Sequence, residues 1–288
     1  MFGKKKMNLN LRAFADLGVE VPDRPLDLSK VMSEEGILHP YIIVTMGRTG
    51  STWLAAALGQ IPVINTPNEY FSQEAIKHYG DFSEPQTFEN HFRTVLRRYG
   101  RSGCFGFKIN PRRLNWLSEA IDMQRTFPTD GCGWIEMKRI NLVKQAFSYA
   151  RAKVSGHWHD FAGREEKAED TAFVSDQFVW QHIIEILEEE EIFRRFTSAY
   201  DINPMRITYE EIYDSKDQLL IRVTSHIRDD IDMSSGISSV TDRVTKLKSS
   251  GLGDEATFIR RYAGLINYIM TNRDSISCDW VKSQVSKL

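Results

Sequence analysis

Residues 41–58 read Y-I-I-V-T-M-G-R-T-G-S-T-W-L-A-A-A-L, and this stretch decides the fold. Residues 41–45 form a short run of β-branched and aromatic side chains behind a proline, which is typical of a buried strand. Two glycines then bracket residues 48–49, and an apolar run of good helix formers follows the Ser-Thr pair at 51–52. The stretch therefore predicts a strand, a glycine-containing turn and the N-terminus of a helix.

The predicted turn has the properties of an anion site. Backbone N–H groups and the helix dipole converge at a helix N-terminus, Ser51 and Thr52 add hydroxyl donors, and Arg48 adds a full positive charge. The expected ligand is a phosphate. The alternative is a tight strand-to-helix turn that carries a surface arginine.

The turn is not a Walker A loop, because that motif requires a lysine after its last glycine and here Gly50 is followed by Ser51. ATP is therefore disfavoured as the ligand. A nucleotide-dependent kinase is kept as the alternative enzyme, although a clear strand-end aspartate for magnesium is also missing from the sequence. A nucleotide- or sugar-binding protein without turnover is the non-enzymatic alternative.

The composition is that of a globular protein. The chain has 288 residues, 41% of them hydrophobic and 26% charged, which suits a single α/β domain over residues 1–288. The net charge of −2 argues against a nucleic-acid partner, whose protein would be basic overall. The three cysteines are widely spaced and suggest neither a disulfide framework nor a metal site.

The sequence indicates neither a signal peptide nor a membrane span. Residues 7–20 carry charges where a signal peptide needs an apolar core, and no apolar run approaches the ~20 residues that cross a bilayer. We therefore expect a cytoplasmic protein whose membrane contact is at most peripheral.

The rest of the chain alternates between strand and helix patterns. Further strands are expected at 61–64, 104–109, 134–137 and 205–208. With helices between them, they predict an α/β fold of the P-loop-like, three-layer kind, in which helices flank a central parallel sheet. We also expect a lead-in at 1–39, a long helix or helix pair at 171–200 whose four consecutive glutamates face solvent, a flexible basic loop at 234–253 and a closing helix at 258–270.

Two segments resemble the donor site of sulfotransferases that use 3′-phosphoadenosine 5′-phosphosulfate (PAPS). R-T-G-S-T-W at 48–53 resembles the loop that holds the 5′-phosphate and the sulfuryl group. W-I-E-M-K-R-I-N-L-V-K-Q-A-F-S at 134–148 resembles the segment whose strand-end arginine and helical serine bind the 3′-phosphate. These residues would be Arg139 and Ser148, with Lys138 as the alternative cation. A surface arginine and a buried helix serine are the structural alternative.

Three further segments resemble the trehalose sulfotransferase family of bacterial carbohydrate sulfotransferases. They are N-E-Y-F at 68–71, V-S-G-H-W-H at 154–159 and T-Y-E-E-I at 208–212. The resemblance implies transfer of a sulfuryl group from PAPS to a hydroxyl of a carbohydrate or glycolipid, with 3′-phosphoadenosine 5′-phosphate (PAP) as the product and no metal. Whether the chain forms a homodimer is left open.

The resemblance also implies roles for particular residues. Glu69 is expected to be the general base and Arg48 to stabilise charge on the transferred group. The implied donor-binding residues are Arg48, Thr49, Gly50, Ser51, Thr52, Trp53, Arg139, Ser148 and Lys246, with Trp53 stacking on adenine. The implied acceptor-binding residues are Glu69, Tyr70, Phe71 and Trp158, since sugar C–H faces pack on aromatic rings.

Two of these positions keep an alternative interpretation. Glu69 also suits the first turn of a helix, where a carboxylate is common, and in that case His157 or His159 would be the base. Lys108, near the end of an expected strand, is either a further donor-side cation or a structural lysine.

Overall fold

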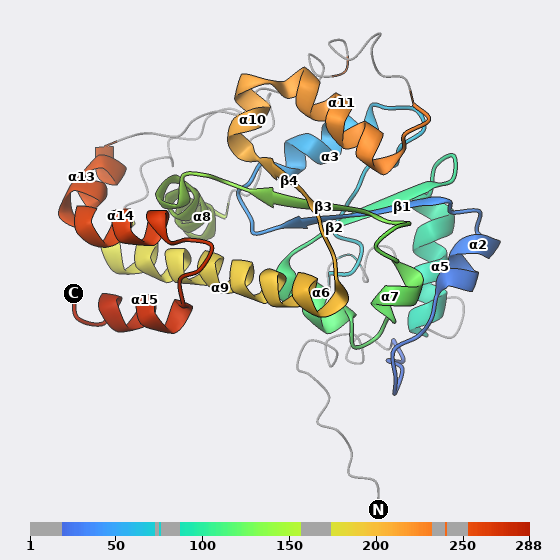
Figure 1. Cartoon of the computed structure of the whole chain (residues 1–288), viewed down its shortest axis with the longest axis horizontal. Helices are drawn as coiled ribbons and strands as arrows, with labels where there is room; N and C mark the ends of the chain where they lie inside the picture. The colour runs from blue at the N-terminus through green and yellow to red at the C-terminus, as the bar shows by residue number, and fades with distance from the viewer. Residues whose placement is uncertain (1–18, 73–74, 76–86, 157–173, 232–239, 241–252) are drawn as a thin grey trace, which may run out of the picture.

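A computed structural model describes residues 19–72, 75, 87–156, 174–231, 240 and 253–288. Its centre is one sheet of four strands in the order β2-β1-β3-β4, and every neighbouring pair is parallel (Figure 1). The strands are β1 (His39–Thr45), β2 (Cys104–Ile109), β3 (Gly133–Lys138) and β4 (Met205–Thr208). The predicted central parallel sheet is confirmed, and the predicted bounds of β2 and β4 match those observed.

Helices cover both faces of this sheet (Figure 1). On one face lie α3 (Ser51–Gly59), α10 (Tyr209–Asp214) and α11 (Lys216–Ile227); on the other lie α6 (Pro111–Leu117), α8 (Leu142–Ser155) and α9 (Asp176–Tyr200). Side chains of a strand alternate between the two faces. Accordingly, Tyr41 and Ile43 of β1 pack with α3 and α11, whereas Ile42 and Val44 join the larger core with α8 and α9. The fold is thus the three-layer α/β arrangement that the sequence predicts.

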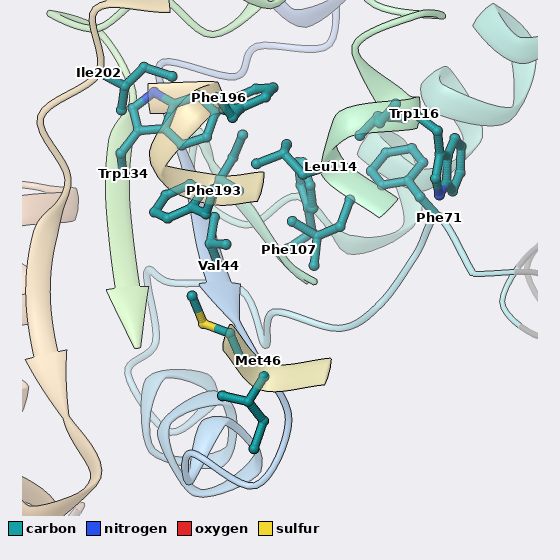
Figure 2. Close-up of a cluster of buried hydrophobic side chains, with 14 of the residues drawn as sticks. Val44, Met46, Phe71, Phe107, Leu114, Trp116, Trp134, Phe193, Phe196 and Ile202 are labelled. Atoms are coloured by element: carbon teal, nitrogen blue, oxygen red, sulfur yellow. The ribbon is translucent and has the colours of Figure 1, made fainter. Parts of the chain in front are cut away.

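The larger core is rich in aromatic rings (Figure 2). Trp134 of β3 lies against Phe196 of α9, with ring centroids 6.0 Å apart, and Phe193 stacks beside Phe196. Rings of this size dominate core energetics, because burying apolar surface stabilises the fold by about 25 cal/mol per Å². These contacts fix the long helix α9 against the sheet.

The remaining helices of the described ranges lie around these layers. They are α2 (Ser29–Glu34), α5 (Phe88–Tyr99), α7 (Met123–Thr126), α13 (Gly253–Arg261), α14 (Ala263–Thr271) and α15 (Cys278–Val285). The prediction of one closing helix at 258–270 is wrong, because the backbone leaves the helical conformation at Tyr262 (φ −116°, ψ 23°) and separates α13 from α14. The predicted lead-in contains α2, and α15 is an addition that the sequence pattern does not predict.

The expected strand at 61–64 is also wrong, because this segment forms a turn. The edge of β2 is covered instead by the side chain of Asn65. Its amide donates to the carbonyl oxygen of Gly106 (2.8 Å), and the N–H of Gly106 donates to Asn65 Oδ1 (2.7 Å). Further along, the N–H of Lys108 donates to the carbonyl oxygen of Asn68 (3.0 Å). The chain therefore reaches the carboxyl end of β2 without forming a strand.

The carboxyl ends of all four strands meet at one edge of the sheet. β1 is central, with β2 on one side and β3 on the other, so the chain changes direction around β1. Ligands of open α/β sheets bind at such a switch point, outside the carboxyl ends of the strands. The turn after β1, at residues 46–50, occupies this position. None of the helices in the described part of the chain is long and apolar enough to cross a membrane.

Candidate functional site

The turn after β1 has a left-handed backbone at three positions. Gly47 and Arg48 both have φ of 59°, and Gly50, which precedes α3, has φ of 83°. A Cβ at Gly47 would lie 2.6 Å from the ring of Tyr149, and a Cβ at Gly50 would lie 2.6 Å from Ile212 Cδ1. Both glycines are thus required by conformation and by space. Arg48 tolerates the same backbone region at an energetic cost, which is frequent at functional sites.

Contacts beneath and beside the turn hold it in place. The hydroxyls of Thr45 and Thr49 are 2.5 Å apart, and the Thr49 side chain is fully buried. From α8, the amide of Gln145 donates to the carbonyl oxygens of Met46 (3.2 Å) and Gly47 (2.9 Å). Since two carbonyl oxygens are engaged by this donor, they contribute less repulsion to an anion bound at the turn.

The structure brings the two predicted phosphate segments together. Arg48 Nε donates to Ser148 Oγ at 2.9 Å, so the turn after β1 directly contacts α8. Ser51 and Thr52 lie half-buried in the first turn of α3, at the helix N-terminus that follows the turn. A donor bound by the turn would therefore lie within reach of both segments.

Arg139 follows β3. The ring of Tyr209 lies beside both Arg139 and the turn after β1. The guanidinium carbon of Arg139 is 4.2 Å from the centroid of Tyr209, a cation–π contact, and a Cβ at Gly50 would lie 3.0 Å from the same ring. Arg139 Nε is buried and has no hydrogen-bond partner among the residues that the structure describes. A charged donor of this kind is available to an anionic ligand.

Lys138, the alternative cation, is engaged elsewhere. Its amine pairs with Asp274 Oδ1 (3.2 Å) and with Glu136 Oε1 (3.5 Å). The geometry therefore favours Arg139 over Lys138 for a phosphate. Tyr209 belongs to the T-Y-E-E-I segment, but the sequence pattern alone does not assign it to the site.

More positive charge gathers around Arg139. Glu255 of α13 is buried, and burial raises the pKa of this carboxyl, while Lys144, Arg139 and Arg151 act in the opposite direction. The end of β3 and the exposed side of α8 thus present basic side chains towards α13. Such a field favours an anionic ligand.

Glu69 follows Asn68, which pairs with Phe107 of β2, and its side chain is 49% exposed. Its Oε2 accepts a hydrogen bond from Arg113 Nη1 at 2.6 Å. The Lys108 side chain is 8% exposed, and burial lowers its amine pKa while the charge of Glu69 raises it. Glu69 is therefore an accessible carboxylate that pairs with Arg113 and acts electrostatically on Lys108.

Tyr149, one residue beyond Ser148, lies near both the turn after β1 and Glu69. Its ring contacts Gly47, and burial raises the pKa of its hydroxyl, with Glu189, Glu185 and Glu69 acting in the same direction. The ring centroid of His182 lies 4.8 Å away. Sequence reasoning missed Tyr149, although a position adjacent to a predicted helical ligand is the signal that indicates it.

Three aromatic predictions need correction. Tyr70 is 1% exposed, donates its hydroxyl to the carbonyl oxygen of Thr66 (2.8 Å) and stacks on Tyr99. Phe71 is 2% exposed and packs on Phe107, with ring centroids 4.9 Å apart, inside the core (Figure 2). The segment that crosses the edge of β2 turns these rings inward, so neither offers a face to a sugar.

Trp53 is likewise a core residue in this structure. Its side chain is 5% exposed and belongs to the cluster beneath α3 with Leu54 and Leu58. This burial contradicts the expectation of an open indole face for adenine.

Several predicted residues lie outside the described part of the chain. They are Trp158, Lys246, the alternative bases His157 and His159, and nearly all of the basic loop at 234–253. Within the described ranges, no group of three or more His, Cys, Asp or Glu side chains is placed to hold a metal ion.

A strand, a glycine turn and a helix N-terminus at the switch point of a parallel sheet define a P-loop-like α/β protein. The family model of the Stf0 sulphotransferases, which is the trehalose sulfotransferase family, matches residues 40–263, well over half of the chain. The chain belongs to this family, and it is accordingly a sulfotransferase. No curated protein matches the sequence.

Proposed function

We propose that the protein transfers a sulfuryl group from PAPS to a hydroxyl of a carbohydrate or glycolipid. PAPS carries anionic groups at its 5′ and 3′ positions, so a protein that selects it needs two cationic contacts. The observation that carries the proposal is the pairing of Arg48 with Ser148 at 2.9 Å beside Arg139, whose Nε lacks a partner within the described residues. Family membership supports the sulfuryl chemistry, and this geometry supports the choice of donor.

The donor would bind across the carboxyl edge of the sheet. Arg48, Ser51 and Thr52 would hold the 5′-phosphate and the sulfuryl group at the N-terminus of α3. Arg139 and Ser148 would hold the 3′-phosphate. Tyr209 lies beside both Gly50 and Arg139 and would contact the nucleoside between the two phosphates.

In the transfer step, the acceptor oxygen attacks sulfur while the bond between sulfur and the 5′-phosphate oxygen breaks. Glu69 takes the proton of the acceptor hydroxyl, and PAP leaves with the electron pair of the broken bond. Because the sulfuryl group and the leaving phosphate are anionic, catalysis depends on positioning and on cationic donors such as Arg48 and Lys108. Arg113 Nη1 donates to Glu69 Oε2 at 2.6 Å and would orient this carboxylate for the proton transfer.

The acceptor would enter beside Glu69, where the side chain is exposed. Tyr149 replaces Tyr70 and Phe71 as the aromatic candidate for a sugar face, because its half-buried ring lies between the phosphate turn and the Glu69 side. Arg113 of α6 pairs with Glu69, the charges of Glu185 and Glu189 of α9 act on Tyr149, and these side chains would bond sugar hydroxyls.

The test is transfer of labelled sulfate from PAPS to a panel of free sugars and glycolipids, in the presence of EDTA. We expect label to appear in at least one carbohydrate product without added metal. Tight PAP binding with no transfer to any member of the panel would instead support a binding protein without turnover. Binding of ATP with magnesium in preference to PAP would support the kinase alternative.

A further inference from the structure

The turn that carries Arg139 is held by one arginine from the C-terminal part of the chain. Arg273, which follows α14, donates from Nη1 to the carbonyl oxygens of Arg139 (2.7 Å) and Ile140 (3.0 Å). The same guanidinium binds Glu190 of α9 through Nε (3.1 Å) and Nη2 (2.6 Å). One side chain thus connects the long helix α9 to the backbone of the proposed 3′-phosphate site.

This connection is buried. The side chains of Arg273 and Glu190 are 11% and 5% exposed. Glu190 belongs to the run of four glutamates that was expected to face solvent, and its burial corrects that expectation. A bidentate arginine–carboxylate pair fixes orientation as well as distance, and removing either member leaves the other charge buried without its partner.

The opposite side of the turn is fixed by a second carboxylate. Glu210 of α10 accepts hydrogen bonds from the N–H groups of Ile140 (2.9 Å) and Asn141 (3.3 Å). Asn141 in turn caps α8, since its Oδ1 accepts from the N–H of Lys144 (2.9 Å). Because the protein's own carboxylate occupies these backbone donors, an incoming phosphate depends on the side chain of Arg139.

We propose that Arg273 and Glu190 are positioning residues for the 3′-phosphate of the donor. They hold the backbone at residues 139–140 so that the Arg139 guanidinium stays over Tyr209, with its Nε, which has no partner within the described ranges, available to the 3′-phosphate. Arg273 lies beyond residue 263, where the family match ends, so the C-terminal segment takes part in donor selection. The inference rests on the proposed function, because it presupposes a donor with a 3′-phosphate.

The experiment compares PAP with adenosine 5′-monophosphate, which lacks the 3′-phosphate, by calorimetric titration of the full chain. In Arg273→Ala and Glu190→Gln, the Kd for PAP should rise about tenfold or more, because a displacement of about 1 Å is costly at a directional site. The Kd for the monophosphate should change by less than about twofold, since the 5′ site is untouched. Glu190→Gln is close in shape to the native residue and covers the case in which Arg273→Ala does not fold.

Arg194→Ala is the matched control. Arg194 also extends from α9 and binds the carbonyl oxygen of Asp274, the neighbour of Arg273. None of the hydrogen bonds described for Arg194 reaches the turn that carries Arg139. Both nucleotide affinities should therefore stay at the wild-type value in this variant.

A double variant separates positioning from general support of the fold. In an Arg139→Ala background, adding Arg273→Ala should weaken PAP binding by less than about twofold further, since the group being positioned is already gone. Equal losses of PAP and monophosphate binding in Arg273→Ala, or an unchanged PAP affinity, would overturn the positioning role while leaving the proposed donor intact. A wild-type protein with no preference for PAP over the monophosphate would overturn the proposed donor, and the positioning role with it.

Discussion

Arg48 combines two unusual properties, a left-handed backbone and a place in the proposed donor site. Glycine adopts such a backbone without strain, whereas arginine does so at a cost of about 1 kcal/mol. The backbone of Arg48 thus lowers local stability, whereas its side chain serves the proposed donor site. Its guanidinium already binds Ser148, so the side chain is held in place before the donor arrives.

Replacing Arg48 with glycine should separate these two properties. Arg48→Gly relieves the backbone strain and removes the charge, so PAP affinity should fall about ten- to a hundredfold without loss of folding. Ser102→Gly is the control, because Ser102 also has a positive φ (49°) but lies after α5, outside the site. Calorimetric titration with PAP checks both variants. Unchanged affinity in Arg48→Gly would remove Arg48 from the donor site.

Glu69 carries the proposed proton transfer. Glu69→Gln keeps the size of the side chain but cannot accept a proton at neutral pH, so turnover should fall about a hundredfold or more while PAP affinity stays within about threefold. Glu34→Gln is a matched control, since Glu34 is similarly exposed (44%) and is also paired with an arginine, Arg93, at 2.9 Å. Near-normal turnover in Glu69→Gln would point to His157 or His159 as the base.

The elements around the turn after β1 leave no room for a larger residue at Gly50. Gly50→Ala adds a Cβ that would lie 2.6 Å from Ile212 Cδ1 of α10, in addition to the strain of a positive φ. Gly36→Ala is the matched control, because Gly36 has a φ of 69° with nothing within 4 Å of the added Cβ. In chemical denaturation, we expect Gly50→Ala to lose about 1–3 kcal/mol more than Gly36→Ala. Equal losses would show that α10 does not confine the turn.

Glu189 on α9 should make stability depend on pH. Burial raises the pKa of its carboxyl from 4.5 to about 7, with Arg112 acting against this shift. A carboxyl with a raised pKa in the folded state contributes stability that is complete below about 4.5 and is lost as the pH rises through about 7. Glu189→Gln should therefore match the wild type at pH 4.5 and be more stable at pH 8, by up to about 3 kcal/mol.

Denaturant unfolding across this pH range measures the effect. The neighbouring Glu188 supplies the control, because the pKa of its carboxyl is shifted in the opposite direction. Burial alone would raise the pKa of Glu188, but hydrogen bonds from Lys282 and Arg112 prevail and lower it. Glu188→Gln should consequently lose stability at neutral pH. Parallel pH profiles for Glu189→Gln and the wild type would contradict the assignment.

The sequence predicts the elements best where a single local pattern suffices. β2 and β4 are short runs between clear breakers, and their observed bounds match the expected ones. The strand at 61–64 fails because a tertiary contact, the side chain of Asn65 on the edge of β2, replaces backbone pairing. No local pattern in the sequence reveals such a contact.

For the candidate site, too, the sequence predicts only those residues that follow from a local motif or from the topology. Residues on the turn after β1 and at the end of β3 follow from motif and topology, whereas Glu69 lies alongside β2 and the strand expected at 61–64 does not form. The burial of Tyr70 and Phe71 depends on the path of the chain across β2, which periodicity does not encode. Tyr149 and Arg273 are likewise contributed by packing between distant segments.

At the scale of the whole molecule, a four-stranded parallel sheet brings segments separated by more than two hundred residues to one edge. In the proposed site, residues from the turn after β1 and from α8 would bind one ligand, and Arg273 of the C-terminal segment holds the backbone of Arg139. The organisation as a single domain over 1–288 and the cytoplasmic location stay predictions.

The central claim is that this edge selects PAPS, and a calorimetric titration of the full chain in EDTA tests it most directly. PAP, adenosine 5′-monophosphate and ATP would be titrated in turn, with ATP repeated in the presence of magnesium. The account predicts that PAP binds without metal and at least about tenfold more tightly than the monophosphate, because one additional charged phosphate contact is made. Equal affinity for PAP and the monophosphate, or a preference for ATP with magnesium, would contradict it.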